Sequence, residues 1–591
     1  MVFGCEMAGI GGSLPVIGVD VPLVPFDLAA AVAETEAEEA RATSSGAAAA
    51  PAAGEGGEDP VAAYARLAAA EGGVTYDTLM GLVEAGLAGA GQGADEVAKA
   101  DAAFEADVAD LRAANEAFAP GAHPGSDVRY GWSWDPSDAY RVAAGKPAQA
   151  VGWKTFEVGE QPGAKGRELL DVARARELLR PLLHGTPEEG GSFNGMYGRV
   201  GFKGVSFGVD EARVINAVFA KHTSLREVDL SDILSGRGDQ VATEVLAVLA
   251  EGLQHLEEVW ELDISDNALG ERGVRTLGPA LRANRGIRRL VFRNDGMSSQ
   301  ACEALAEILL EGREETPLTQ IASLNNMSGD EGATALGRLF AASPRLEDLQ
   351  FSSCRVSTDG CVAICEGLLR GATLRGAAGQ GAGGALRRLD LSGNMYMPEG
   401  GEALGRMLRE QRGLECLNLA DTGLTDEGVA SVLGGLRAAS APLRELDLSL
   451  NEVTAEAVDD VAAYACLVAP TLEALALNEN EFEDDGGKAL CDALLAHPAG
   501  FPRLQRLSLL TNMLGAPASL AACALAVRTP SLTALLLDDN QIPEAALAKI
   551  RDALDRAGRS GVLGPLDDND ADGADDADAD DLENLMSGLN L

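Results

Sequence analysis

The chain has few aromatic residues and few basic ones. Of its 591 residues 4% are aromatic, and 47 Lys and Arg stand against 92 Asp and Glu, which gives a formal net charge of −45 at pH 7. A field of that sign repels nucleic acid and anionic membrane surfaces, and it favours basic protein partners. We therefore predict that the chain binds no nucleic acid.

Long hydrophobic runs are also missing. The apolar opening has no basic n-region, and Asp20 and Asp27 interrupt it, so we expect neither a signal peptide nor membrane insertion. The nine cysteines are an odd number without a paired framework, and eight of them lie after residue 300. This pattern predicts a reducing compartment and free, structural thiols.

Catalytic and metal-binding patterns are absent or incomplete. The five His residues are dispersed, and no Gly-x-x-x-x-Gly-Lys-Ser/Thr phosphate loop occurs. The stretch 568–573 imitates the start of a calcium loop, but Ala579 stands where the bidentate Glu belongs. Cys361 and Cys365 are one helical turn apart without a His or further Cys at a fitting spacing, which favours core packing. We expect no metal site, no cofactor of its own and no enzymatic activity of its own.

What the sequence has instead is one pattern that repeats from Leu225 to about Ala545. Complete copies of Leu-x-x-Leu-x-Leu-x-x-Asn begin at Val259, Leu386, Leu443, Leu472, Leu504 and Leu532, the first with Val in place of Leu. Imperfect copies begin at Leu225, Ile287, Leu318, Leu346 and Leu414. Successive starts from Val259 onward fall mostly 28 to 32 residues apart, with one gap of 40. This is the leucine-rich repeat signature.

The repeat predicts the fold. One Leu-x-x-Leu-x-Leu segment is too short to form a core, so each unit must stack its apolar side chains on those of its neighbours. The Asn amide can bond backbone groups of the turn, and the rest of the unit leaves room for roughly three helical turns. We predict an α/β horseshoe solenoid of the ribonuclease-inhibitor type, with a parallel sheet inside and helices outside.

Local patterns give more detailed expectations. Val274, Leu277 and Leu281 lie at helical spacing on one face, and Ser328 with Glu331 fits a capping box. Cys354 replaces the repeat Asn as a small buried thiol, and the Gly-rich stretch 370–385 is interpreted as a surface loop insertion.

The expected domains follow the changes in composition. They are a disordered N-terminus (1–59), a small helical module (60–125), an aromatic-rich connector with a lead-in helix (126–196), the leucine-rich repeat domain (197–558) and an acidic C-terminal tail (559–591). The tail is either a disordered, solubilising end or a segment that speeds encounter with a basic partner.

The loops after the early strands carry polar residues. Asp232, Gly236 and Arg237 follow the first regular strand, and Asp266, Asn294 with Asp295, and Asn325 follow the next three. Because the strands are parallel and in register, these loops should align along one rim, where parallel sheets commonly place function. Asn294 precedes the position of the repeat Asn, which Asp295 occupies, so the repeat itself does not require Asn294.

Four of these segments, in this order, resemble the Ran GTPase-activating proteins, the plant branch most closely. They are Ser-Asp-Ile-Leu-Ser-Gly-Arg (231–237), Leu-Asp-Ile-Ser-Asp-Asn-Ala-Leu-Gly (262–270), Arg-Asn-Asp-Gly-Met (293–297) and Asn-Asn-Met-Ser-Gly-Asp-Glu-Gly (325–332). The tail segment Pro-Leu-Asp-Asp-Asn-Asp (565–570), followed by acidic residues, is similar to the same branch. The likeness runs from about Phe156 to the C-terminus.

The resemblance implies a mechanism by assistance. Small GTPases hydrolyse GTP slowly until the attacking water is oriented. In this family no arginine finger is inserted, and an Asn matching Asn294 orients the catalytic glutamine of Ran. Arg237 takes a supporting role, and Asp266, Asp295 and Asn325 contact the switch regions. The implied partner is Ran-GTP, alone or with Ran-binding protein, and GTP and magnesium are bound by the GTPase.

One departure concerns location. Plant members carry an N-terminal Trp-Pro-Pro motif that attaches them to the nuclear envelope, and the nearest match here is the weak one at Trp134, Asp135 and Pro136. The cytoplasm is therefore the expected location, with a perinuclear anchor through the N-terminal module as the alternative. The competing function is a pure interaction scaffold like ribonuclease inhibitor, because the same horseshoe can grip partners without activating a GTPase.

Overall fold

The computed structural model describes residues 154–158, 168–184, 197–381, 383–566 and 569. The predicted N-terminal segment and helical module, most of the connector and nearly all of the acidic stretch lie outside the described residues. Within the described part, no helix is both long enough and apolar enough to cross a membrane.

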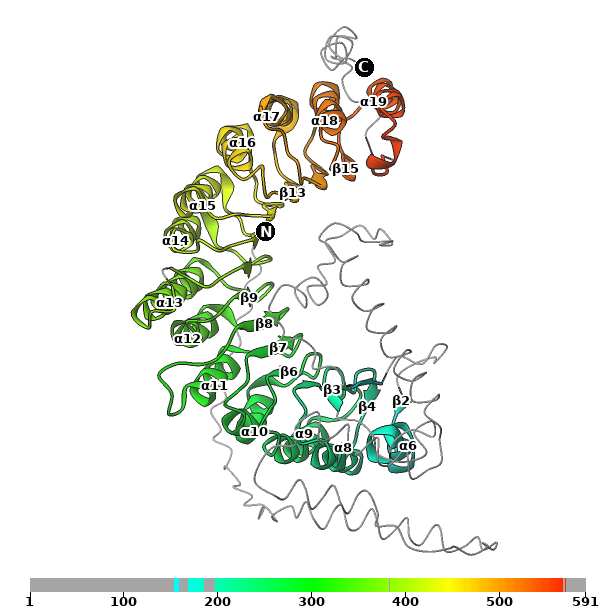
Figure 1. Ribbon diagram of the computed structural model, residues 1–591, viewed down its shortest axis with the longest axis vertical. Coiled ribbons are helices and arrows are strands. Elements are labelled where there is room, and N and C mark those ends of the chain that lie inside the picture. Colours follow the sequence, from blue (N-terminus) through cyan, green and yellow to red (C-terminus); the bar gives the residue numbers. More distant parts are fainter. Residues whose placement is uncertain (1–153, 159–167, 185–196, 382, 567–568, 570–591) are drawn as a thin grey trace, which may run out of the picture. The chain divides into compact units, whose positions relative to one another are not determined.

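Thirteen of the described strands form one long parallel sheet, in the order in which they occur along the chain (Figure 1). They are β1 (Lys154–Glu157), β3 (Tyr197–Gly201), β5 (Glu227–Asp229), β6 (Glu261–Asp263), β7 (Arg289–Arg293), β8 (Gln320–Leu324), β9 (Asp348–Gln350), β10 (Arg388–Asp390), β11 (Cys416–Asn418), β12 (Glu445–Asp447), β13 (Ala474–Ala476), β14 (Arg506–Ser508) and β15 (Ala534–Leu536). Every pairing in this sheet is parallel, and equivalent repeat positions are in register, as in Leu262 opposite Leu290. The sheet thus begins before residue 197, at β1.

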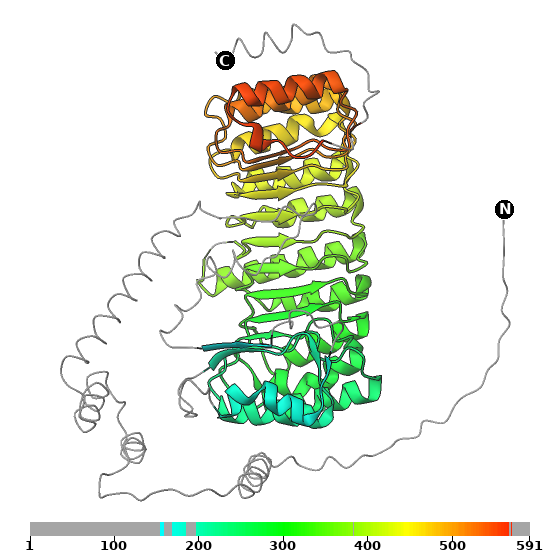
Figure 2. The ribbon, with the colours of Figure 1, turned by 90° about the vertical axis from the view of Figure 1, so that its right-hand side faces the viewer.

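Helices connect successive strands and lie side by side on one face of the sheet, as two views show (Figures 1 and 2). They are α8 (Val209–Lys221), α9 (Asp239–Leu253), α10 (Gly270–Ala283), α11 (Ser299–Leu310), α12 (Gly329–Ala341), α13 (Thr358–Ala377), α14 (Met397–Leu408), α15 (Thr425–Ala439), α16 (Val458–Leu467), α17 (Glu483–Ala496), α18 (Ala516–Arg528) and α19 (Glu544–Arg556). Two short helices, α6 (Val172–Leu178) and α7 (Arg180–His184), and a second sheet of β2 (Glu168–Leu169) and β4 (Val205–Ser206) precede them. The predicted leucine-rich repeat solenoid is confirmed.

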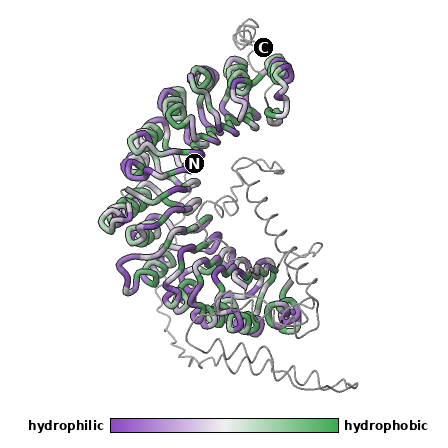
Figure 3. The backbone as a smooth tube through the Cα atoms, in the orientation of Figure 1, coloured by the Kyte–Doolittle hydropathy of each residue, from purple (hydrophilic) through white to green (hydrophobic). Residues whose placement is uncertain are grey.

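The core lies between the sheet and the helices. In the repeat of β6 the three apolar motif positions, Val259, Leu262 and Ile264, are buried. The predicted face of α10 is buried against them, and each such side chain contributes about 1.5–3 kcal/mol by leaving water. Hydrophobic and hydrophilic segments alternate accordingly along the repeats (Figure 3). No unit holds this core alone, which is why the repeats must stack.

Two local predictions were wrong. Ser328 precedes α12 but makes no capping bond, because its Oγ donates to the carbonyl of Met297 (3.1 Å) in the neighbouring repeat. The Gly-rich insertion is not a loop throughout, since α13 runs on through Ala377 before the turn begins. In both places packing against the neighbouring unit decided the outcome, since Gly371 on α13 lies against the carbonyl of Phe340 on α12.

The C-terminal end of the array extends into the predicted tail. Leu566 is buried against the last repeat, and Asn569 accepts the backbone N–H of Asn540 (3.0 Å). The side chain of Asn569 therefore supplies one more unit of the Asn series described next.

Candidate functional site

A ladder of side chains runs beneath one edge of the sheet, at the repeat position that follows each strand. Its asparagines are Asn267, Asn326, Asn394, Asn451, Asn480, Asn512 and Asn540, all buried. Asn480 shows the pattern: its Oδ1 accepts the N–H groups of Asn451 and Val453 from the previous repeat, and its Nδ2 donates to the carbonyls of Leu448 and Leu477. The amide thus satisfies turn groups that would otherwise be buried without partners.

The residue before each ladder position lies on the outer rim with a positive φ. Asp266, Asn294 and Asn325 have φ of 63°, 54° and 53°. This left-handed region is strained for most residues but is tolerated by Asn and Asp. The turn therefore directs the ladder side chain inward and the preceding side chain toward the rim.

Three predicted site residues meet on this rim in one chain of hydrogen bonds. Asn325 Nδ2 donates to Asn294 Oδ1 (3.1 Å), and Asn294 Nδ2 donates to Asp266 Oδ1 (3.3 Å). Asn294 and Asn325 are exposed, and Asp266 is half-buried. These two bonds use one of the two N–H groups and one of the two oxygen lone pairs of Asn294. The exposed amide is oriented by its neighbours and keeps bonding capacity for a partner.

Asp295, by contrast, cannot make its predicted partner contact from this position. It is 0% exposed because it occupies the ladder, where its Oδ1 accepts the N–H of Asn267 (2.9 Å). Burial raises the pKa of its carboxyl to about 8, and the charges of Asp263 and Asp266 add to the increase. Its Oδ2 is buried without a hydrogen-bond partner.

Arg237, in the loop after β5, is half-buried. One guanidinium nitrogen donates to the carbonyl of Ser206 (2.9 Å) and to that of Leu170 (3.3 Å). These carbonyls belong to the end of the small β2–β4 sheet, so Arg237 ties the loop after β5 to that sheet.

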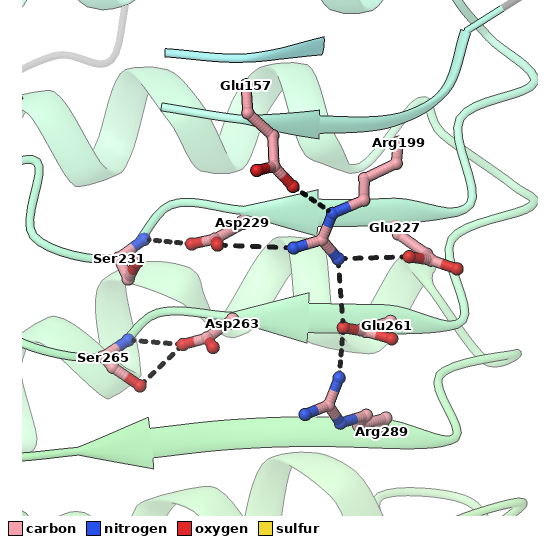
Figure 4. A network of polar contacts seen from close by, with 9 residues as sticks. All are labelled: Glu157, Arg199, Glu227, Asp229, Ser231, Glu261, Asp263, Ser265 and Arg289. Carbon is pink, nitrogen blue, oxygen red and sulfur yellow. Dashed lines mark hydrogen bonds and ion pairs between the residues drawn. The ribbon is translucent and has the colours of Figure 1, made fainter. Parts of the chain in front are cut away.

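A network of charges covers the sheet face opposite the helices, across β1, β3, β5, β6 and β7 (Figure 4). Arg199 lies at its centre and contacts four carboxylates, those of Glu157 (2.8 Å), Glu227 (3.1 Å), Asp229 (3.6 Å) and Glu261 (3.4 Å). Arg289 pairs with Glu261 from the other side.

The network is acidic and partly desolvated. Burial alone lowers the pKa of Arg199, but the hydrogen bond to Glu157 and the other carboxylates raise it above its ordinary value. Burial and the charge of Asp229 raise the pKa of Asp263 beside the network. The repeat motif fixes only its Leu and Asn positions, so it does not predict the charged residues of this cluster. Charged residues at equivalent strand positions of neighbouring repeats were the sequence signal that could have indicated it.

The cysteines have no such arrangement. The eight described cysteines are free, and those at 354, 361 and 365 are buried. Cys354 occupies the ladder as predicted, with its Sγ donating to the carbonyls of Ser323 and Ser352. Burial raises its pKa to about 12. In the described ranges no group of three His, Cys, Asp or Glu side chains could hold a metal ion.

Comparison with known proteins agrees with this geometry. A family model described as "Leucine Rich repeat" matches residues 413–433, 439–462 and 468–491. The chain is a leucine-rich repeat protein.

The matches of this leucine-rich repeat protein to individual relatives are partial. Ribonuclease inhibitor of Sus scrofa is 26% identical over 313 residues, which are 53% of this chain and 58% of that protein. RAN GTPase-activating protein 2 of Arabidopsis thaliana is 38% identical over 118 residues, 20% of each chain. RAN GTPase-activating protein 1 of the same plant is 32% identical over 125 residues, 21% of this chain and 22% of that protein. The repeat protein therefore spans less than two thirds of each of these relatives.

The structure also shows rim residues that the sequence patterns did not single out. Met327 is 50% exposed and lies two residues after Asn325, and Met395 is 66% exposed on the same rim two repeats further along. The repeat motif does not specify this position, and Met513, 38% exposed after Asn512, occupies it as well. The sequence signal that could have identified them is a Met directly after the repeat Asn.

Proposed function

We propose that this leucine-rich repeat protein is a GTPase activator for Ran, which holds Asn294 against the catalytic glutamine of the GTPase. The observation that carries the proposal is the rim arrangement. Asn294 is exposed, and its amide is bonded to neighbouring rim side chains and not to its own turn. The order of motifs around this position and the partial likeness to two plant RAN GTPase-activating proteins support it.

The chemistry follows from what an amide can do. Asn presents a donor and an acceptor together, and a glutamine side chain presents the complementary pair. A glutamine held in this way orients the water that attacks the γ-phosphate, while GTP and magnesium stay on the GTPase. Because Asp266 and Asn325 fix the Asn294 amide beforehand, little side-chain entropy is lost when the partner binds.

No arginine finger is part of this proposal. The guanidinium of Arg237 already donates to two backbone carbonyls. Withdrawing it would remove the donor to the Leu170 carbonyl, which costs roughly 1–3 kcal/mol, while the Ser206 carbonyl keeps the backbone N–H of Leu170 (3.0 Å). Its role in the proposal is to hold the loop between β5 and α9.

The test is single-turnover GTP hydrolysis by Ran with this protein at catalytic concentration. We expect stimulation by the unaltered chain and loss of stimulation in Asn294→Ala. Binding of Ran-GTP without faster hydrolysis would overturn the proposal.

That outcome would favour the second candidate, an interaction scaffold like ribonuclease inhibitor. The acidic network around Arg199 is the observation that favours it, because a partly desolvated, negatively charged sheet face suits a basic protein ligand. A charge-reducing change there, Glu227→Gln, should then weaken partner binding, whereas the activator proposal predicts no effect of it on the maximal stimulated rate.

A further inference from the structure

We propose that Asp295 stands in the ladder as an uncharged carboxylic acid, and that this protonated form positions Asn294 for a partner. The positioning role rests on the proposed function above. The protonation state does not, and it can be tested separately.

The first argument comes from the other ladder residues. Each of the seven buried ladder asparagines, from Asn267 to Asn540, donates through Nδ2 to at least two backbone carbonyls. The ladder residues after β9 and β11 are not Asn but keep a donor: Cys354 Sγ donates to the carbonyl of Ser323, and Thr422 Oγ1 to that of Leu419. In the units from β6 onward the inner side of the turn therefore requires a donor, whereas the preceding unit carries Ile233 at this position, which has none.

Asp295 fits this requirement only when it carries a proton. Its Oδ1 accepts from Asn267 N–H as a ladder amide oxygen does, and its Oδ2 takes the place of Nδ2. By register with Asn267, the carbonyls that this atom faces are those of Ile264 and Phe292. An ionised Oδ2 would set a buried negative charge against carbonyl oxygens, whereas an O–H can donate to one of them.

The surrounding charges act in the same direction. The titratable groups facing Asp295 are Asp263 on β6 and Asp266 on the rim, both acidic, and both oppose its ionisation. On the other side the neighbouring rung is the neutral Asn326, whose Oδ1 accepts the N–H of Asp295 (3.0 Å). Burial is the largest cause of the raised pKa of Asp295, about 8, and these charges add to it.

The link to Asn294 is short. Asp295 holds the backbone of Asn267, and the adjacent residue Asp266 accepts the hydrogen bond from the amide of Asn294. Asn294 is itself the residue before Asp295 in the chain. A charge at position 295 would repel the Asp266 carboxylate and disturb both ends of this bond. Asp295 is thus a positioning residue, since it contacts no substrate itself.

The experiment compares the full-length chain with Asp295→Asn, which supplies the donor without a proton. The first readout is thermal unfolding from pH 4 to pH 9. We expect the stability gain of the variant over the parent to grow as pH rises toward about 8 and then to level off. Equal pH profiles of unfolding would show that Asp295 is not the protonated donor.

The second readout is the stimulated rate of GTP hydrolysis by Ran, divided by the intrinsic rate at the same pH. Between pH 7 and pH 9 the parent should lose about tenfold, because only the protonated fraction stays competent, and Asp295→Asn should lose none. A variant that changes the unfolding profile but not this ratio would reduce Asp295 to a structural role.

Asn480→Asp is the matched control. It places the same carboxyl in a ladder rung of the β13 repeat, far along the array from Asn294. We expect it to make stability pH-dependent and to leave the pH profile of activation unchanged. If Asn480→Asp altered the pH profile of activation as strongly as Asp295 does in the parent, activation would follow global stability. That result would overturn the positioning role. If the parent does not activate Ran at all, the proposed function and the positioning role fail together, while the unfolding comparison still decides the protonation state.

Discussion

The repeats around β6–β8 and those around β12–β15 are built on the same plan but use it differently. Around β12–β15 every rung is a buried asparagine: Asn451, Asn480, Asn512 and Asn540. The backbone N–H of Asn451 donates to Asn480 Oδ1, and that of Asn512 donates to Asn540 Oδ1. Around β6–β8 one rung is Asp295, and the rim above it carries an oriented amide, Asn294. The regular repeats show what stacking requires, so the departures in the other region have to be explained by something else.

The two regions can be compared directly through one rim hydrogen bond in each. In the C-terminal region Thr511 Oγ1 donates to Asp539 Oδ2 (2.9 Å), which is the counterpart of the bond from Asn294 to Asp266. Both pairs join adjacent repeats at the same turn position, and all four residues have a positive φ. A rim hydrogen bond is thus not peculiar to the candidate site. What differs is that one of them presents an exposed carboxamide.

The largest expected effect separates these two pairs. Asn294→Ala should lower the stimulated rate of GTP hydrolysis by about 10²- to 10³-fold, the usual loss when one preorganised polar group is removed. Thr511→Ala removes an equivalent rim bond and should leave the rate unchanged. Single-turnover hydrolysis with both variants, after matched melting curves, makes the comparison. A similar loss of rate in both variants would mean that the loss comes from a disturbed fold and not from the missing Asn294 amide.

The next effect is on stability, and it is expected in the region around β12–β15. Asn480→Ala removes the acceptor for two backbone N–H groups and the donor to two carbonyls in a buried turn. We expect the free energy of unfolding to fall by roughly 2–4 kcal/mol, because these groups stay buried without partners. Denaturant unfolding measures it. Asn325→Ala on the exposed rim is the control and should cost under about 1 kcal/mol.

A third effect concerns the pH dependence of stability, which differs between the two regions. Burial raises the pKa of Asp447 on β12 to about 6, lower than that of Asp295, because Ser449 donates two hydrogen bonds to it. The folded state therefore takes up a proton between about pH 4 and 6, and stability falls as pH rises through that window. Asp447→Asn should remove this loss, which amounts to roughly 3 kcal/mol at most. Unfolding of the variant and the parent at several pH values should converge below pH 4 and run parallel above pH 6, whereas a gap that keeps widening to pH 8 would contradict the assignment.

The sequence alone was sufficient for the architecture, because Leu-x-x-Leu-x-Leu at a constant interval leaves one way to bury its side chains. It also placed Asn294 on the rim, since the repeat does not need an amide there. It did not place the contacts that depend on neighbouring units. The Oγ of Ser328 bonds across to Met297, and Arg199 draws its carboxylate partners from other strands. Such contacts depend on the register of the stack, which no single repeat encodes.

The smallest expected effect concerns the acidic tail, where the structure separates two roles. Leu566 and Asn569 complete the last rung of the ladder, while the acidic residues beyond them add charge to a chain that is already strongly negative. Removing residues 571–591 should leave the melting temperature and the maximal stimulated rate unchanged. It should lower the association rate with a basic partner at low salt, and the difference should vanish as screening increases.

Cutting at residue 565 instead should also lower the melting temperature, because Asn540 then loses the acceptor for its backbone N–H. Stopped-flow association at several salt concentrations, together with melting curves of both truncations, tests this division. Equal melting temperatures for the two truncations would mean that the array ends at α19 and that Asn569 is not one of its rungs. A salt-independent difference in association rate would mean that the tail acts through a specific contact, since the attraction of a diffuse charge must weaken when the solution screens it.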